Sequence, residues 1–181
     1  MPDAGFRHLG DREVVTLDRI RVVRGRFAAP DGTQFERDVV RNQRVVAMIP
    51  VLDDGRVLLV RQYRGPIDGE ILEIPAGLCD QPGEDLAATA ERELVEEIGR
   101  SPGHLELVAR FHPAAGFSDQ IVHLYLATDL TEVPDARQGV EEEHMTVEAV
   151  DLDDVPAMIA DGRLVDGKTL IGLLLARQLL G

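Results

Sequence analysis

The chain is poor in several residue types, and each scarcity limits what kind of protein it is. Its 181 residues include one cysteine, Cys79, no tryptophan and only 4% aromatic residues. A single cysteine cannot form an internal disulfide, which is typical of a reducing compartment. Acidic residues outnumber basic ones 33 to 19, giving a formal net charge of −14. This charge argues against nucleic acid or an anionic membrane surface as the main partner.

Long apolar runs are also lacking. The longest apolar stretch, 170–180, contains Gly172, Arg177 and Gln178 and is too short to span a bilayer. The first ten residues have neither the basic start nor the apolar run of a secretion signal. We therefore expect a soluble, cytoplasmic protein that buries one sizeable core and carries a small appendage.

Strand-like and helix-like segments follow each other without a regular βαβ rhythm. Val- and Ile-rich segments bounded by turn residues predict strands at 13–27, 34–40, 45–52, 56–62, 70–74, 105–111, 120–127 and 145–150. Helical patterns predict helices at 84–98, 155–160 and 168–180. This mixture predicts an α+β fold, in which a mixed sheet lies between helices in an α/β/α sandwich.

The first part of the chain reads as a small antiparallel β unit. We place it at 1–42 and the main domain at 43–181. Two or three strands alone bury too little to be stable, so this unit must pack on something. At the start of the main domain, Asp53-Asp54-Gly55 separates two strand-like segments and predicts a hairpin.

A helix near the middle of the chain carries three carboxylates on one side. Glu93, Glu96 and Glu97 stand at i, i+3 and i+4. Carboxylates this close repel each other, and a multivalent cation would offset the repulsion. Glu93 and Glu97 border the apolar arc of this helix, where the helix would meet the sheet. The arc consists of Leu86, Ala87, Ala90, Leu94 and Ile98.

The alternative interpretation is an ordinary charged helix with an Arg92–Glu96 pair, but the whole segment resembles the Nudix box. That pattern is Gly, five residues, Glu, seven residues, Arg-Glu-apolar-any-Glu-Glu-any-Gly-apolar. The chain departs from it in two places: six residues separate Gly77 from Glu84, and Arg100 stands where an apolar residue is usual. The extra residue falls in a loop, where an insertion is tolerated. The matching residues are Gly77, Glu84, Arg92, Glu93, Leu94, Glu96, Glu97 and Gly99.

The resemblance covers most of the chain and is to ADP-ribose pyrophosphatases, especially the actinobacterial kind. It is carried by the segments 61–64, 72–77 and 116–119 and by the acidic loop before Met145. The resemblance implies a Nudix-fold homodimer whose subunits exchange N-terminal strands, which suits a strand unit at the start of the chain. It also implies hydrolysis of ADP-ribose to AMP and ribose 5-phosphate.

The resemblance further implies a metal site with Mg²⁺, for which Mn²⁺ substitutes. Arg92 would orient the carboxylates and Glu84 would hold the loop at the helix start, while Gly77 and Gly99 are structural. Zinc is disfavoured because Cys79 and the histidines form no ligand spacing. The implied metal ligands are Glu93, Glu97, Glu96 and the Ala76 carbonyl, and Glu97 also counts among the catalytic residues.

The catalytic base is implied to be a glutamate of the loop 141–143, with Glu142 ahead of Glu141. The alternative for this run is a solvated acidic loop. The candidates for contact with the substrate are Arg64, Arg61, Arg41 and Glu73. The arginines have a plainer interpretation as surface ion-pair residues, and Glu73 is expected either to pair with one of them or to face the metal cluster.

Two alternative functions stay open. One is cleavage of another nucleotide sugar of the GDP-mannose type, because Ala115 stands where ADP-ribose enzymes usually carry proline. The other is a Nudix-fold ligand sensor without catalysis. A sensor is disfavoured because every box carboxylate is present and no basic helix-turn-helix segment is found.

Overall fold

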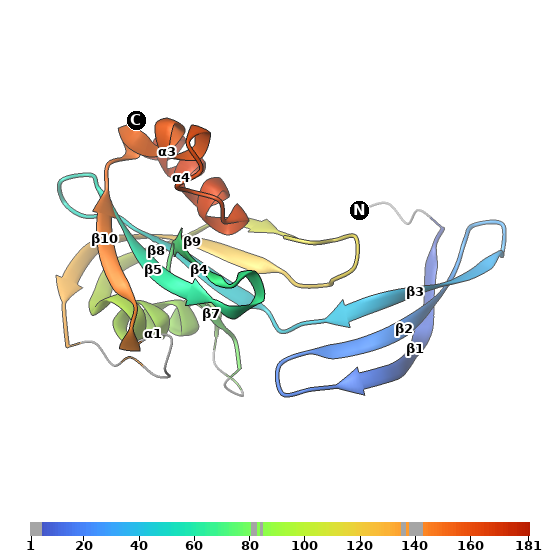
Figure 1. Ribbon diagram of the computed structural model, residues 1–181. Helices are drawn as coiled ribbons and strands as arrows, with labels where there is room; N and C mark the ends of the chain where they lie inside the picture. The colour runs from blue at the N-terminus through green and yellow to red at the C-terminus, as the bar shows by residue number, and fades with distance from the viewer. Residues whose placement is uncertain (1–4, 81–82, 84, 135–136, 138–142) are drawn as a thin grey trace. The chain divides into compact units, whose positions relative to one another are not determined.

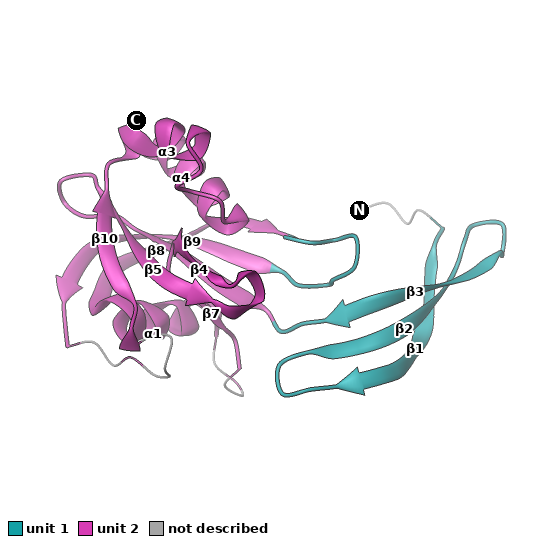
Figure 2. Cartoon of the chain, in the orientation of Figure 1, with its two compact units in different colours: residues 1–43, 112–121 teal, residues 44–111, 122–181 magenta. Residues whose placement is uncertain are grey.

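The computed structural model describes residues 5–80, 83, 85–134, 137 and 143–181. The chain forms two compact units, residues 1–43 with 112–121 and residues 44–111 with 122–181 (Figure 2). The division into domains at 1–42 and 43–181 stays a prediction, since compactness alone does not show which part folds or acts independently.

Unit 1 is a three-stranded antiparallel sheet in the order β1-β2-β3, with a loop attached to it. The strand predicted at 13–27 is in fact interrupted by a turn, in which the Leu17 amide donates to the Ile20 carbonyl at 2.8 Å. The loop 112–121 joins β3 through the Val40 amide, which donates to the Phe117 carbonyl at 2.8 Å. The strands are β1 (Arg7–Thr16), β2 (Arg21–Ala28) and β3 (Gln34–Arg41).

Unit 2 contains two sheets between helices (Figure 1). The sheet β7-β4-β9-β8 is mixed because β4 and β9 run parallel, whereas the sheet β10-β5-β6 is antiparallel. The strands are β4 (Val45–Pro50), β5 (Val57–Arg64), β6 (Gly69–Glu73), β7 (Ala76–Leu78), β8 (Arg100–Phe111), β9 (Val122–Glu132) and β10 (Thr146–Val150). The helices are α1 (Leu86–Ile98), α3 (Val155–Ala160) and α4 (Gly167–Leu180), with 3₁₀ turns η1 (Gly65–Ile67) and η2 (Leu152–Asp154).

The core of unit 2 lies on both faces of β4. Met48 points into the cluster that contains Leu94 of α1, whereas Ile49 points into the cluster that contains Leu173 of α4. Successive residues of a strand face opposite sides, so an uninterrupted apolar strand must be covered on both. Each of these side chains is fully buried, which is worth about 2 kcal/mol apiece. The predicted α/β/α sandwich is confirmed.

The hairpin predicted between β4 and β5 is wrong beyond its turn. The turn itself is present, since the Leu52 amide donates to the Arg56 carbonyl at 2.8 Å. Val51 and Val57 form one isolated bridge, but β4 and β5 do not pair further and belong to different sheets. Both strands are apolar at successive positions, so each finds partners on its own side of the core instead of pairing with the other.

Several boundaries also differ from the prediction. Helix α1 begins at Leu86 instead of Glu84, because the Asp85 carboxylate caps it by accepting from the Ala87 amide at 2.7 Å. Strand β8 begins at Arg100, five residues before the predicted start. The three-residue strand β7 was not predicted. No helix in the described part of the chain is long and apolar enough to cross a membrane.

Candidate active site on helix α1

Helix α1 holds two of its glutamates at the edge of the core. Glu93 is 9% exposed and Glu97 is 4% exposed, whereas Glu96 is half-buried. Their neighbours Ala90, Leu94 and Ile98 pack in the cluster below, as the apolar arc predicted. Burial of a carboxylate without a partner is unfavourable, so the surroundings of this pair matter.

Strand β7 supplies the backbone that meets these carboxylates. The Ala76 amide donates to Oε2 of Glu97 at 3.1 Å. At Gly77 an added Cβ would overlap the Glu93 carboxylate. The glycine is therefore needed because the helix carboxylate lies directly against the strand, and not because of an unusual backbone angle.

Arg92 lies between two of the glutamates. Its Nη1 is 2.8 Å from Oε1 of Glu93 and 2.8 Å from Oε2 of Glu96, and its Nη2 is 3.8 Å from Asp80. The guanidinium offsets the repulsion between the carboxylates and fixes their orientation. The Arg92–Glu96 pair of the alternative interpretation is therefore present, but it is one part of a larger charged cluster at the edge of the core.

The donor chemistry of this cluster suits a hard divalent cation. Two buried carboxylates lie against the backbone of Ala76 and Gly77, and carboxylate and carbonyl oxygens are the ligands that Mg²⁺ prefers. Within the described residues, however, no three His, Cys, Asp or Glu side chains converge on one point as a ready metal site. Arg92 is directed at two of the carboxylates instead. The residue types therefore suit a divalent cation. The described side chains do not, however, gather Glu93, Glu96 and Glu97 around one point, as their spacing had suggested.

A second buried charge cluster is centred on Glu73, the last residue of β6. Glu73 is 2% exposed and accepts from Arg64 Nε at 2.7 Å and from Lys168 Nζ at 2.5 Å. Of the two expectations for Glu73, the structure shows the pairing with an arginine. Lys168 also contacts Asp166 at 3.0 Å. Lys168 was not predicted, because it lies 95 residues from Glu73 and only the fold brings the two together.

The other two arginine candidates have different surroundings. Arg61 on β5 binds Glu148 on β10 through Nε at 2.5 Å and Nη2 at 3.3 Å. Arg41 belongs to unit 1, where it donates to Asp11 at 2.9 Å and to Asp119 at 3.1 Å. The hydrogen bond from Arg41 lowers the pKa of the Asp11 carboxyl.

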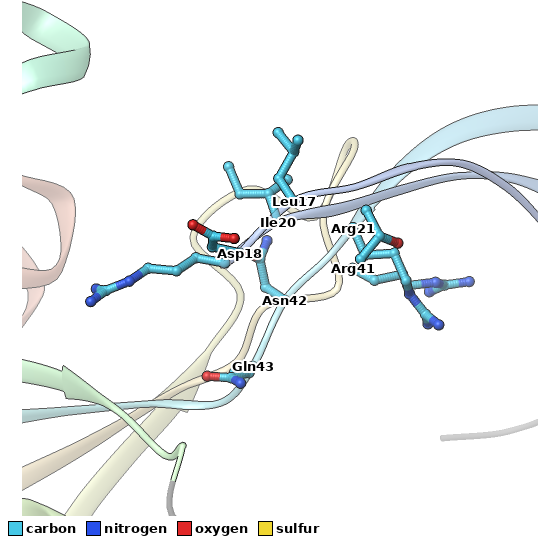
Figure 3. Close-up of a pocket in the computed structure, with 9 residues that line it drawn as sticks. Leu17, Asp18, Ile20, Arg21, Arg41, Asn42 and Gln43 are labelled. Atoms are coloured by element: carbon cyan, nitrogen blue, oxygen red, sulfur yellow. The ribbon is translucent and has the colours of Figure 1, made fainter.

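Arg41 also lines a hollow of about 300 Å³ in unit 1 (Figure 3). The turn between β1 and β2 and the residues after β3 form its walls, with Asp18, Arg21 and Asn42 among the labelled side chains. None of the predicted metal ligands lines this hollow.

Three predicted residues fall outside the described part of the chain: Glu84, Glu141 and Glu142. Glu143, at the end of that loop, is described and exposed. Gly99 caps α1 with φ 61°, and its amide donates to the Val95 carbonyl at 3.1 Å. Arg100, which departs from the box pattern, starts β8 and pairs with exposed Glu132 at 2.7 Å.

Comparison with known proteins identifies the family. The NUDIX domain model matches residues 41–170. The chain belongs to the NUDIX family. The NUDIX segment therefore contains β4 to β10 and α1, and the family prediction made from the box is confirmed.

Relatives of this NUDIX chain cover most of its length. It is 36% identical to the ADP-ribose pyrophosphatase of Bacillus subtilis over 77% of this chain and 75% of that protein. It is also 36% identical to a methanol dehydrogenase activator of Bacillus methanolicus, over 80% and 77%. It is 34% identical to the ADP-ribose pyrophosphatase of Mycobacterium tuberculosis, over 92% and 77%.

A solved structure supports the fold of the NUDIX chain independently. The crystal structure of an ADP compounds hydrolase superposes with a TM-score of 0.83, covering 97% of this chain and 94% of that one. At 24% identity this likeness bears on the fold alone. The roles of individual site residues rest on the geometry described above.

Proposed function

We propose that this NUDIX protein hydrolyses ADP-ribose to AMP and ribose 5-phosphate. The observation that carries the proposal is the burial of Glu93 and Glu97 against Ala76 and Gly77, in a chain that is 34% and 36% identical to two ADP-ribose pyrophosphatases. Carboxylates at the edge of a core are costly without a role, whereas a metal-assisted hydrolase needs them.

The proposed metal is Mg²⁺, with Mn²⁺ as a substitute. Bound there, it would neutralise a diphosphate that otherwise repels an attacking water. Glu93, Glu97, Glu96 and the Ala76 carbonyl would hold it. Arg92, which contacts Glu93 and Glu96, is proposed to set the directions of these carboxylates.

The proposed general base is Glu142, with Glu141 as the second choice; both lie outside the described residues. Glu142→Gln is expected to lower kcat by roughly 100-fold or more while Mg²⁺ binding persists, because general-base catalysis contributes on the order of 10²- to 10⁴-fold. The measurements are steady-state kinetics and calorimetric titration with the metal. Unchanged turnover would move the base to Glu141 or elsewhere.

Arg64 is the first proposed contact for the substrate phosphates. Its side chain is 39% exposed although Glu73 anchors it, so its guanidinium reaches solvent from a fixed position. Arg61, equally exposed and held by Glu148, is the second candidate. Arg41 is proposed for a substrate contact in the hollow of unit 1.

The proposed assembly is a cytoplasmic homodimer that exchanges its N-terminal strands. Unit 1 exposes a group of large apolar side chains, which a three-stranded sheet cannot bury by itself. A second copy of the chain would cover them. The exposed residues are Phe6, Leu9, Val14, Val15, Leu17 and Ile20.

The deciding experiment incubates the purified protein with ADP-ribose and Mg²⁺ and separates the products by anion-exchange chromatography. AMP and ribose 5-phosphate in equal amounts, suppressed by EDTA and restored by Mg²⁺, are the expected result. GDP-mannose in a parallel reaction tests the alternative sugar nucleotide, and faster cleavage of it would reassign the substrate. Binding of ADP-ribose without any product would identify a sensor instead of an enzyme.

A further inference from the structure

The Glu73 carboxylate is divided between two cations that come from distant elements. Its Oε2 accepts from Nε of Arg64, at the end of β5, at 2.7 Å, and Nη2 of Arg64 lies 2.6 Å from the same oxygen as an ion pair. Its Oε1 accepts from Lys168 at the start of α4, at 2.5 Å. Each oxygen thus has its own cation, and the carboxylate cannot rotate without losing one of them.

Lys168 is itself fixed by the start of α4. Asp166 caps the helix by accepting from the Thr169 amide at 2.9 Å and from the Thr169 hydroxyl at 2.6 Å, and it contacts Lys168 at 3.0 Å. The same hydroxyl accepts from the Ile74 amide at 2.9 Å. The helix start is therefore anchored to the segment that leads from Glu73 into β7.

The two cations differ in what they can reach. The side chain of Lys168 is 14% exposed, whereas that of Arg64 is 39% exposed. Arg64 uses Nε and Nη2 on one carboxylate oxygen, which leaves its Nη1 edge for another acceptor. Lys168 neutralises the charge of Glu73 from the buried side, so that the positive charge of Arg64 stays available on the exposed side.

We propose that Lys168 is a positioning residue, which holds Glu73 so that the Arg64 guanidinium is fixed and charged toward the phosphates of the substrate. This inference rests on the proposed function, because it assigns Arg64 to the diphosphate of a nucleotide sugar. Lys168 acts through Glu73 and does not touch the substrate.

The first test compares Lys168→Met with a matched control on the same helix. Arg177 pairs at 3.8 Å with Asp153, whose side chain is 94% exposed, so Arg177→Met removes a helix cation without burying a charge. Lys168→Met is expected to raise KM for ADP-ribose roughly 10- to 100-fold with a smaller fall in kcat, because a misplaced phosphate contact weakens binding before and during reaction. Arg177→Met is expected to keep both constants.

A double variant separates positioning from loss of fold. Lys168→Met leaves the buried Glu73 with one cation, which should lower the unfolding midpoint. Adding Glu73→Gln removes the buried charge, so the midpoint of the double variant should return toward that of the wild type. KM should nevertheless stay raised, because Arg64 has lost its charged anchor. A double variant with normal KM, or Lys168→Met with normal KM, would overturn the inference.

A readout without substrate keeps the inference separate from the proposed function. The Nε–H of Arg64 should give a slowly exchanging signal in ¹⁵N NMR spectra that shifts in Lys168→Met and stays unchanged in Arg177→Met. An Arg64 signal that is the same in all three proteins would refute the role of Lys168. If the signal moves but the wild type fails to cleave ADP-ribose, the proposed function fails while the coupling of Lys168 to Arg64 stands.

Discussion

At the scale of single residues, Gly77 is the position where one methyl group would disturb the candidate site most directly. A Cβ there would overlap the Glu93 carboxylate, so in Gly77→Ala either this carboxylate turns away from β7 or α1 and β7 move apart. We expect the variant to lose about 1–3 kcal/mol of stability, as overpacked sites do. We also expect roughly tenfold weaker Mn²⁺ binding, since the carboxylate changes direction. Chemical denaturation and calorimetry measure the two effects.

The control for this change is Gly167→Ala at the start of α4. A Cβ at Gly167 would meet nothing within 4 Å, so stability and metal affinity should stay near the wild-type values. Wild-type metal affinity in Gly77→Ala would show that Glu93 does not need its place against β7.

Glu97 offers a sharper test of the carboxylate cluster, because the substitution keeps its size. Glu97→Gln removes the charge from a side chain that is 4% exposed and accepts from the Ala76 amide. We expect turnover to fall by roughly 100-fold or more, in line with the loss of one electrostatic contact in an active site. Glu91→Gln, on the exposed side of the same helix, is the matched control and should keep its activity. Equal activity in both variants would remove the α1 cluster from the mechanism.

At the scale of elements, strand β9 contains a group that should make stability depend on pH. Burial lowers the pKa of the His123 imidazole below its ordinary value of about 6.5; a backbone hydrogen bond with Val45 opposes this in part, and nearby Arg110 and Arg44 lower the pKa further. Its Nδ1 finds no hydrogen-bond partner among the described residues. The folded state thus favours the neutral ring, so the unfolded state binds more protons as the pH falls below about 6.5.

The contribution of the neutral His123 ring to the free energy of unfolding should be present above about pH 6.5 and decline as the pH falls below it. His123→Gln should show a shallower decline between pH 7.5 and pH 5.5, measured by urea denaturation at each pH. His104→Gln, at an exposed position on β8, should decline as steeply as the wild type. Parallel declines in all three proteins would exclude His123 as the source.

The elements also show which parts of the structure could be predicted from the sequence. Helix α1 could be predicted, because its apolar arc and the glycine that ends it are local signals. Gly99 indeed has the positive φ of 61° expected of a helix cap. The separation of β4 from β5 could not, because a turn signal fixes a reversal of the chain but not the sheet each strand joins. The Glu73–Lys168 contact could not either, since no local pattern links residues 95 positions apart.

At the scale of the whole molecule, charge is distributed very unevenly along the chain. Residues 1–43 carry eight arginines and seven acidic residues, whereas the other 138 residues carry 11 basic and 26 acidic ones. Two copies, each with a formal net charge of −14, repel each other at long range, so association has to come from apolar burial and local contacts. The exposed apolar side chains of unit 1 form a surface for such burial, and the proposed dimer rests on them.

The proposed dimer can be tested on two apolar surfaces of similar exposure. Val15 and Leu17 in unit 1 are 41% and 59% exposed, and Ile171 and Leu174 on α4 are 42% and 48% exposed. Light scattering after size exclusion should give the wild type about twice the 19.9 kDa chain mass. Val15→Lys with Leu17→Lys should give the single-chain mass, because buried charge opposes association. The control variant, Ile171→Lys with Leu174→Lys, should stay dimeric. An interface built by unit 1 would be contradicted if the wild type were monomeric. It would also be contradicted if only the control variant lost the dimer.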